Sequence, residues 1–371
     1  MPANNRIFYA TQAVQLKPQN SDGSSVYANW LSPKGVQSVG ITTTYNLEQL
    51  FQLGQIDLYD QVEETPNVEA TLNKVLDGTP ILYMICMGGS TAVTGANGAP
   101  MANLANNRVN FRLGVFADTN TAATGVPSSY VDCSGMYLSS FTYTFPVAGN
   151  ATEDITLVGN SKVWNSGGGS VLSAPTAGVT AFGFTGSGTS PTTIRRYNVN
   201  YSATILPTGN GGIPIPSGRA EARPYVQSAT IRADLGREAI QEFGRFAPYF
   251  RYATFPIEVT SEFQVTAADG DMVNANDFAA TAGACGTSYK NTVDKQIRFV
   301  VCGATGSDTL TLDLGSKNKL TSANYTGGDT GGGNATSTYS FRTFNNFTVS
   351  ASGSFANSAF LDTVDDPSLT D

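Results

Sequence analysis

The chain has 371 residues, of which 13% are charged, and it has a formal net charge of −8 and no histidine. This composition excludes nucleic-acid binding through a basic surface, Ser-His-Asp and Cys-His catalysis, and zinc sites that contain histidine. The 39 glycines, 20 phenylalanines and 16 tyrosines favour a mainly β protein of short strands and many turns, and the length favours two domains.

In the first half, residues 7–16 predict an opening strand, and a short helix follows at Leu47–Gly54. The helix is predicted because apolar residues recur at helical spacing and a glycine follows them. Its apolar stripe consists of Leu47, Leu50, Phe51 and Leu53. After Pro66, apolar and polar residues alternate through Val68–Asn73, which predicts a strand with one apolar and one polar face.

Further strands are predicted at residues 137–145 and 154–158. Residues 165–190 are rich in glycine, serine and proline and predict a long surface excursion or linker.

The second half repeats this order. A strand is predicted at residues 197–206, and a second helix is predicted from an apolar stripe that ends at Gly244. The stripe consists of Leu235, Ala239, Ile240 and Phe243. The clearest alternation in the chain follows Pro256, over residues 257–266, and further strands are predicted at 296–302 and 339–349.

The two halves are similar in sequence as well as in element order. The tripeptide Val36–Ser38 recurs 190 positions later as Val226–Ser228, and "GNAT" occurs at both 149–152 and 333–336. A slip of one residue then aligns "VEAT" at 68–71 with "IEVT" at 257–260 and keeps each side chain on its own face of the strand. We therefore predict two tandem domains, at residues 1–190 and 191–371.

No residue cluster indicates an enzyme, a metal or a cofactor. The four cysteines are far apart in sequence and form no CxxC pair. Glu258 and Glu262 are separated by roughly 13 Å along one strand face, which suits neither glycosidase geometry. Since no signal peptide or long apolar segment is found, we expect the protein to be made in a reducing cytoplasm.

Three stretches resemble the tail tube proteins of tailed bacteriophages. They are "IFYATQAV" (7–14), the segment from "GVQSVGITTTYNLEQLF" to "NKVLDG" (35–78), and "SSFTYTFPVAGNATEDITLVGN" (139–160). The resemblance covers most of the first half, and the second half resembles the first. It implies two tandem tail-tube-like β-barrel or β-sandwich domains, each with a short flanking α-helix.

The resemblance also implies a structural virion protein of the phage tail, assembled in the host cytoplasm, whose rings stack into a hollow tube that conducts the DNA genome. With two domains per chain, we expect a homotrimeric pseudo-sixfold ring, with a homohexamer as the alternative. The implied partners are other copies of the chain and the sheath, tape-measure, baseplate hub and terminator proteins. DNA would pass through without specific binding.

Two sets of residues are candidates for these roles. The first set, on the polar strand faces, is expected to line the bore: Glu69, Thr71, Asn73, Glu258, Thr260, Glu262 and Gln264. The second set is expected to pair charges between subunits, because acids gather in the first half and arginines in the second. It consists of Asp57, Asp60, Glu63, Glu64, Arg237, Arg245 and Arg251.

Rival functions remain open at this stage. A β-sandwich receptor-binding or adhesin tail protein fits the composition but does not explain the duplication. A tail hub protein of the baseplate shares the duplicated fold but forms a single ring. A polysaccharide depolymerase ranks third, because no catalytic constellation is found.

Overall fold

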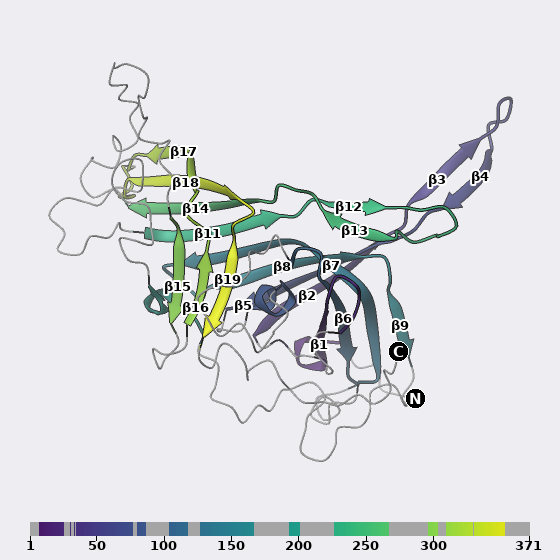
Figure 1. The fold of residues 1–371 in the computed structure, drawn as a ribbon, viewed down its shortest axis with the longest axis horizontal. Coiled ribbons are helices and arrows are strands. Elements are labelled where there is room, and N and C mark those ends of the chain that lie inside the picture. The colour runs from purple at the N-terminus through teal and green to yellow at the C-terminus, as the bar shows by residue number, and fades with distance from the viewer. Residues whose placement is uncertain are drawn as a thin grey trace, which may run out of the picture.

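A computed structural model gives the structure of the protein. It describes residues 7–25, 30, 33, 35–76, 80–86, 104–117, 127–166, 193–200, 226–266, 296–302, 309–328 and 330–352. Within these residues the fold is mainly β, built on an antiparallel sheet of 11 strands with smaller sheets of four, two and two strands (Figure 1). The mainly β class predicted from the sequence is confirmed.

The strands fall into two series. The first half contributes β1 (Gln12–Gln19), β2 (Val36–Thr44), β3 (Leu47–Phe51), β4 (Leu58–Glu63), β5 (Asn67–Val75), β6 (Arg108–Val115), β7 (Ser129–Pro146), β8 (Thr152–Gly159) and β9 (Val163–Ser166). The second half contributes β10 (Val199–Asn200), β11 (Val226–Asp234), β12 (Arg237–Ile240), β13 (Phe250–Ala253), β14 (Glu258–Thr266), β15 (Arg298–Cys302), β16 (Thr309–Asp313), β17 (Lys319–Thr326), β18 (Thr336–Phe344) and β19 (Thr348–Ser352). The helices are short: η1 (Tyr9–Thr11), α1 (Ile81–Cys86) and η2 (Arg196–Asn198).

Strand order in the main sheet repeats the duplication. The sheet runs β17-β18-β14-β11-β7-β8-β5-β2, so the first four strands belong to the second half and the last four to the first half. The long strand β7 corresponds at its C-terminal end to β17, β8 corresponds to β18, β5 to β14 and β2 to β11. Each half therefore supplies the same four-stranded unit, and the two units are joined where β11 pairs with β7.

The pairing registers of the two units agree residue by residue. Two β-bulges, which tend to be specific features of a fold, recur at equivalent positions. They lie at Val36/Ser38 and Val226/Ser228 in the first strand of each unit, and at Leu138/Ser140 and Leu320/Ser322 in β7 and β17. Thr43 faces Val68 and Ala233 faces Val259, so the register makes Val259 the counterpart of Val68. The sequence alignment, which paired Val68 with Ile257, is therefore wrong by two residues, although a shift of two keeps each side chain on the same face of the strand.

The two predicted helices are wrong, because both segments form β-hairpins. β3 pairs with β4, and β12 pairs with β13, as narrow extensions of the strands on either side. Gly54 and Gly244 have positive φ values of 88° and 85° and lie in the hairpin turns rather than after a helix. The apolar spacing misled because all of these side chains except the buried Leu235 are exposed; Leu53 and Phe243, for example, cover no core.

The strands predicted by alternation after Pro66 and Pro256 are confirmed. Buried and accessible residues alternate along β5 and β14, as expected for strands with one face on the core. The expected strand at 339–349 is divided into β18 and β19, and the opening strand begins at Gln12. Of the strand predicted at 197–206, only Val199–Asn200 is seen as β10, and residues 201–206 lie outside the described residues. Most of the excursion, residues 167–190, and the domain boundary at 190/191 lie outside the described residues.

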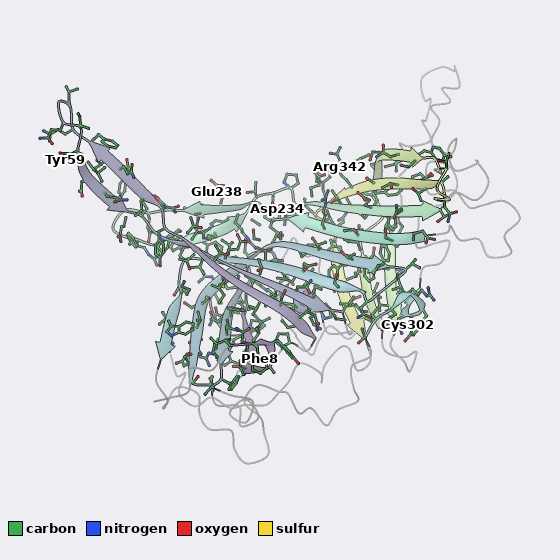
Figure 2. All side chains as sticks on the ribbon, turned by 180° about the vertical axis from the view of Figure 1, so that it is seen from behind. Phe8, Tyr59, Asp234, Glu238, Cys302 and Arg342 are labelled. Atoms are coloured by element: carbon green, nitrogen blue, oxygen red, sulfur yellow. The ribbon has the colours of Figure 1, made fainter. Side chains whose placement is uncertain are left out.

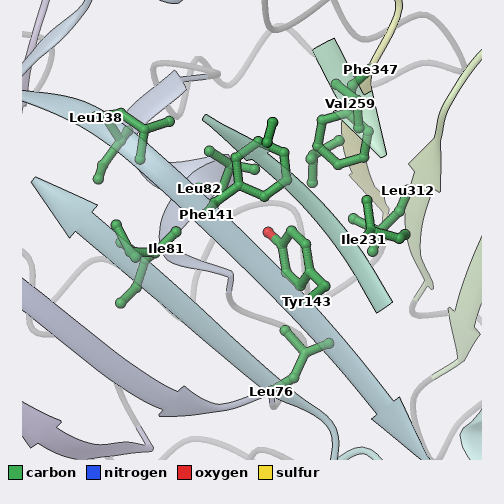
Figure 3. Close-up of a cluster of buried hydrophobic side chains, with 14 of the residues drawn as sticks. Leu76, Ile81, Leu82, Leu138, Phe141, Tyr143, Ile231, Val259, Leu312 and Phe347 are labelled. Atoms are coloured by element: carbon green, nitrogen blue, oxygen red, sulfur yellow. The ribbon is translucent and has the colours of Figure 1, made fainter. Parts of the chain in front are cut away.

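A second layer covers the apolar face of the sheet. In the second half this layer is the sheet β10-β15-β16-β19, which crosses the main sheet in Figure 1. In the first half its counterparts β1, β6 and β9 extend from the N-terminal part of β7, and α1 completes the cover. One continuous core includes both halves (Figure 3), where Phe141 stacks on Phe347 at 5.1 Å and Phe145 stacks on Phe299 at 5.4 Å.

Candidate functional site: a polar sheet face and two open edges

The face of the main sheet that points away from the core is mostly polar on all eight strands, and the partly exposed Pro146 and Val158 are apolar exceptions. All seven residues predicted to line a bore are on this face, on the equivalent strands β5 and β14, which are separated by β11, β7 and β8. Their cross-strand neighbours are also polar: Thr71 faces Thr156, and Glu262 faces Thr230 and Ser340. The sheet therefore brings the seven residues together on one surface.

Hydrogen bonds join side chains across this face. Asn73 donates to the Asp154 carboxylate at 2.5 Å, and the Arg232 guanidinium donates to the Thr260 hydroxyl at 3.2 Å. Its charged groups are the acids Glu69, Asp154, Asp234, Glu258 and Glu262 and the bases Arg232, Lys319 and Arg342. The acids outnumber the bases, and hydroxyl groups fill much of the space between them.

Both outer strands of the main sheet are open edges among the described residues. β2 pairs there only with β5, and β17 pairs only with β18. Tyr325 of β17 is 51% exposed, whereas its counterpart Tyr143 in β7 is fully buried. The two edges are the equivalents of β11 and β7, the strands that join the units inside the chain.

The internal joint has two parts. In the first, β11 pairs with β7 over seven residue pairs, from Ser228–Pro146 to Asp234–Ser140, with Ile231 opposite Tyr143. In the second, the hairpin β12–β13 covers the adjacent part of β7, where the rings of Phe250 and Tyr137 meet edge-on with centroids 5.3 Å apart.

Two of the three arginines predicted to pair charges are part of this joint. Arg237 donates to the carbonyl of Leu138 at 2.6 Å, and Arg251, only 7% exposed, donates to the side-chain oxygen of Asn160 at 3.0 Å. Burial lowers the pKa of the Arg251 guanidinium below its ordinary value. These guanidinium groups therefore bind the first half of their own chain.

The remaining charge-pairing candidates are on the hairpins. Arg245 forms an exposed ion pair with Glu242 at 3.1 Å. The four acids are exposed on the hairpin β3–β4 and its base: Asp57, Asp60, Glu63 and Glu64. Within the chain, the structure thus places the acids and arginines on different hairpins, and charge pairing between chains stays a prediction.

The hairpin β3–β4 projects from the body and exposes large apolar side chains. Tyr59 lies near its far end, while Glu238 marks the shorter hairpin β12–β13 (Figure 2). Exposed apolar residues of the first hairpin are Leu47, Leu50, Phe51, Leu53, Ile56, Leu58, Tyr59 and Val62. Ile240, Phe243, Phe246, Tyr249, Tyr252 and Phe255 are exposed in and beside the second. An apolar surface of this kind marks an interaction site.

A buried charged cluster fixes the core of the first half. The carboxylate of Glu153 accepts hydrogen bonds from the backbone amides of Ile81 and Leu82 at the start of α1, at 2.7 and 2.9 Å. It also accepts one from the Tyr143 hydroxyl at 2.7 Å, and Lys74 is its buried neighbour on β5. Burial raises the pKa of Glu153, against the opposing effect of Lys74 and these donors.

Sequence reasoning missed Lys319 and Arg342 at the β17 edge and the pair Lys74–Glu153. Only the pairing register shows that Lys319 is the counterpart of Tyr137, because the offset between the halves changes along the chain. Nothing in the local sequence marks Glu153, which lies in a strand where buried and partly exposed residues alternate.

No protein-family model matches the chain, and no curated protein is similar to it in sequence. Among the described residues, no helix is long and apolar enough to span a membrane. That part of the chain also contains no group of three or more acidic, cysteine or histidine side chains that could hold a metal ion.

Proposed function

We propose that the protein is a structural subunit that forms closed rings through its open sheet edges, and that the rings stack into the hollow tail tube of a bacteriophage. The observation that carries this proposal is the internal joint. One chain contains two equivalent units, and each outer edge is the equivalent of a strand that is paired within the chain.

A ring follows if the internal joint is repeated between chains. Such a head-to-tail contact uses two different surfaces, so it adds units by a constant rotation and closes into a ring when the rotation divides a full turn. Closure also removes both open edges, which otherwise invite uncontrolled association. Six units, and hence three chains, give the pseudo-sixfold ring that the resemblance to tail tube proteins implies.

The polar sheet face would then be the wall of the bore. Its hydroxyl and amide groups offer little apolar surface to a passing duplex, and its excess of carboxylates repels phosphate. A chain of net charge −8 lacks the basic groups that hold DNA by counterion release. DNA would therefore slide through the bore without binding to it.

The apolar hairpins would make the contact between rings. The hairpin β3–β4 extends beyond the body of the subunit, and the fully exposed Leu53 and Ile56 at its turn have no apolar neighbours to cover them. A neighbouring ring would remove these side chains from water, which stabilises stacking at about 25 cal/mol per Å² of apolar surface buried.

Electron microscopy of the purified protein tests the proposal. We expect rings with apparent sixfold symmetry and, at higher concentration, hollow tubes. A protein that stays monomeric at every concentration would contradict the assembly role and favour the receptor-binding or adhesin alternative. Single rings that never stack would favour the tail hub alternative.

The position of the polar face can be tested separately by thiol labelling. In assembled tubes, Thr71→Cys should react with small maleimides but be protected from a large maleimide–polyethylene glycol that cannot enter the bore. Ser24→Cys, near the end of β1 in the other layer, is the matched control and should react with both reagents. Equal labelling at both positions by the large reagent would place the polar face on the outer wall.

A further inference from the structure

The internal joint also specifies which residues meet between chains. Because β2 matches β11 and the end of β7 matches β17, each residue pair of the internal joint has a counterpart at the open edges. The contact Ile231–Tyr143 becomes Ile41 opposite Tyr325, and Arg232–Thr142 becomes Thr42 opposite Asn324.

We propose that β2 of one chain pairs antiparallel with β17 of the next in this register, and that Asp60 of the first chain's hairpin meets Lys319 of the second. This interface rests on the proposed ring assembly and assigns its residues. Its partner is a second copy of the same chain.

The charge contact follows from the second part of the internal joint. Phe250 packs on Tyr137 there, and the registers of the hairpins and of the main sheet make Asp60 the counterpart of Phe250 and Lys319 that of Tyr137. An aromatic contact within the chain is thus replaced by opposite charges between chains. Both residues are exposed in the single chain.

A neighbouring position follows the same rule. Arg251 donates to the side-chain oxygen of Asn67 at the internal joint. The counterparts are Gln61 and Glu258, again a donor and an acceptor, and Glu258 lies on β14 beside Arg342 with a nitrogen–oxygen distance of 3.9 Å. The hairpin residue can therefore again donate to the strand residue, although both residue types have changed.

The charges also select the mode of pairing. If two β17 edges met in parallel, Lys319 and Arg342 of both chains would be brought together, and like charges at an interface disfavour the wrong partner. Pairing of β17 with β2 instead brings these bases toward the acidic hairpin. The result is a head-to-tail contact, which is the kind that forms rings.

Cysteine cross-linking tests the register. Directly opposite residues have Cα atoms about 4.5–5.5 Å apart, within reach of a disulfide, and a shift of two residues takes them beyond it. In assembled protein, Thr42→Cys with Asn324→Cys should join chains under mild oxidation. The shifted pair Thr42→Cys with Ser322→Cys is the control and should react at least tenfold less.

The outcomes separate the interface from the assembly. Rings that form without a cross-link at Thr42–Asn324, or that prefer the shifted pair, would overturn the interface and leave the proposed function standing. Absence of any ring in the unsubstituted protein would overturn both.

Charge reversal gives a second, independent readout. Asp60→Lys and Lys319→Asp should each raise the concentration needed for assembly by about tenfold, and combining them should restore it. Glu48→Lys is the matched control, because its counterpart Glu238 is exposed beside the internal joint. If the double variant assembles no better than the single variants, Asp60 and Lys319 do not meet.

Discussion

The two halves of the chain share a backbone plan but differ in what their cores contain. Across three strands of the first half, Lys74, Glu153 and Tyr143 are neighbours in register. At the same places in the second half are Val265, Ser337 and Tyr325. Strand order and bulges have been kept while a buried charged cluster is present in only one unit. The fold is therefore specified by strand pairing and alternation, and the cluster serves a local purpose.

That purpose is to hold α1. The Glu153 carboxylate satisfies the amides of Ile81 and Leu82, which would otherwise be buried without a partner at the start of the helix.

The second comparison is between the internal joint and the open edges of the main sheet. Tyr143 is buried at the former and Tyr325 exposed at the latter, which is the difference expected between an interface already formed and one awaiting a partner.

The largest expected effect comes from breaking the buried cluster. Glu153→Ala removes three hydrogen bonds and leaves Lys74 buried without its carboxylate, so the free energy of unfolding should fall by about 3–5 kcal/mol. Ser337→Ala, at the equivalent position of the second half, should change it by less than about 1 kcal/mol. Urea denaturation followed by circular dichroism measures both; similar losses would show that the two cores do not differ as described.

The equivalent tyrosines should behave differently. Tyr143→Ala removes a fully buried ring and should cost about 3–5 kcal/mol of stability. Tyr325→Ala should cost less than about 1 kcal/mol in the isolated chain but weaken assembly, which sedimentation velocity would detect. A Tyr325→Ala variant that assembles normally would remove this residue from the interface.

The apolar turn of the hairpin β3–β4 should affect stacking alone. Leu53→Asp with Ile56→Asp should leave ring formation and monomer stability unchanged, since both side chains are exposed, but should prevent tubes. Electron microscopy distinguishes rings from tubes. Normal tubes from this variant would exclude the hairpin turn from the contact between rings.

The smallest effect is a pH dependence in the first half. Burial raises the pKa of the Cys133 thiol to about 11 from its ordinary value of 9.0. The unfolded chain then loses this proton at lower pH than the folded chain. The thiol's contribution to stability is therefore complete below pH 9 and is lost as the pH rises toward 11, by on the order of 1–2 kcal/mol.

Thermal unfolding from pH 8 to 11 measures this loss. Cys133→Ala should flatten the decline, and Cys302→Ser, in the second half, is the matched control. An unchanged slope in Cys133→Ala would assign the alkaline loss to other groups, such as Tyr137 and Tyr339, whose pKa values are also raised by burial.

The sequence predicted the parts of the fold that depend on alternation. β5 and β14 could be identified with their correct faces because one side of each strand covers the core. The hairpins β3–β4 and β12–β13 could not be predicted, because their exposed apolar residues do not pack on a core and happen to be spaced like the apolar stripe of a helix. The joint between β11 and β7 was also out of reach, because it pairs residues about 90 positions apart and no local pattern identifies the partner.

The candidate site divides in the same way. The seven polar-face residues were found by alternation, and the structure brings them to one surface. Lys319 was missed because its role depends on equivalence with Tyr137, which only the register of β17 with β18 establishes.

The central claim is that each chain supplies two equivalent units to a closed ring. Native mass spectrometry of isolated rings counts the chains directly. Three chains per ring, each contributing two units to a sixfold arrangement, is the expected result. Six chains in a ring of sixfold symmetry would contradict the account, because the units within one chain would then occupy different environments.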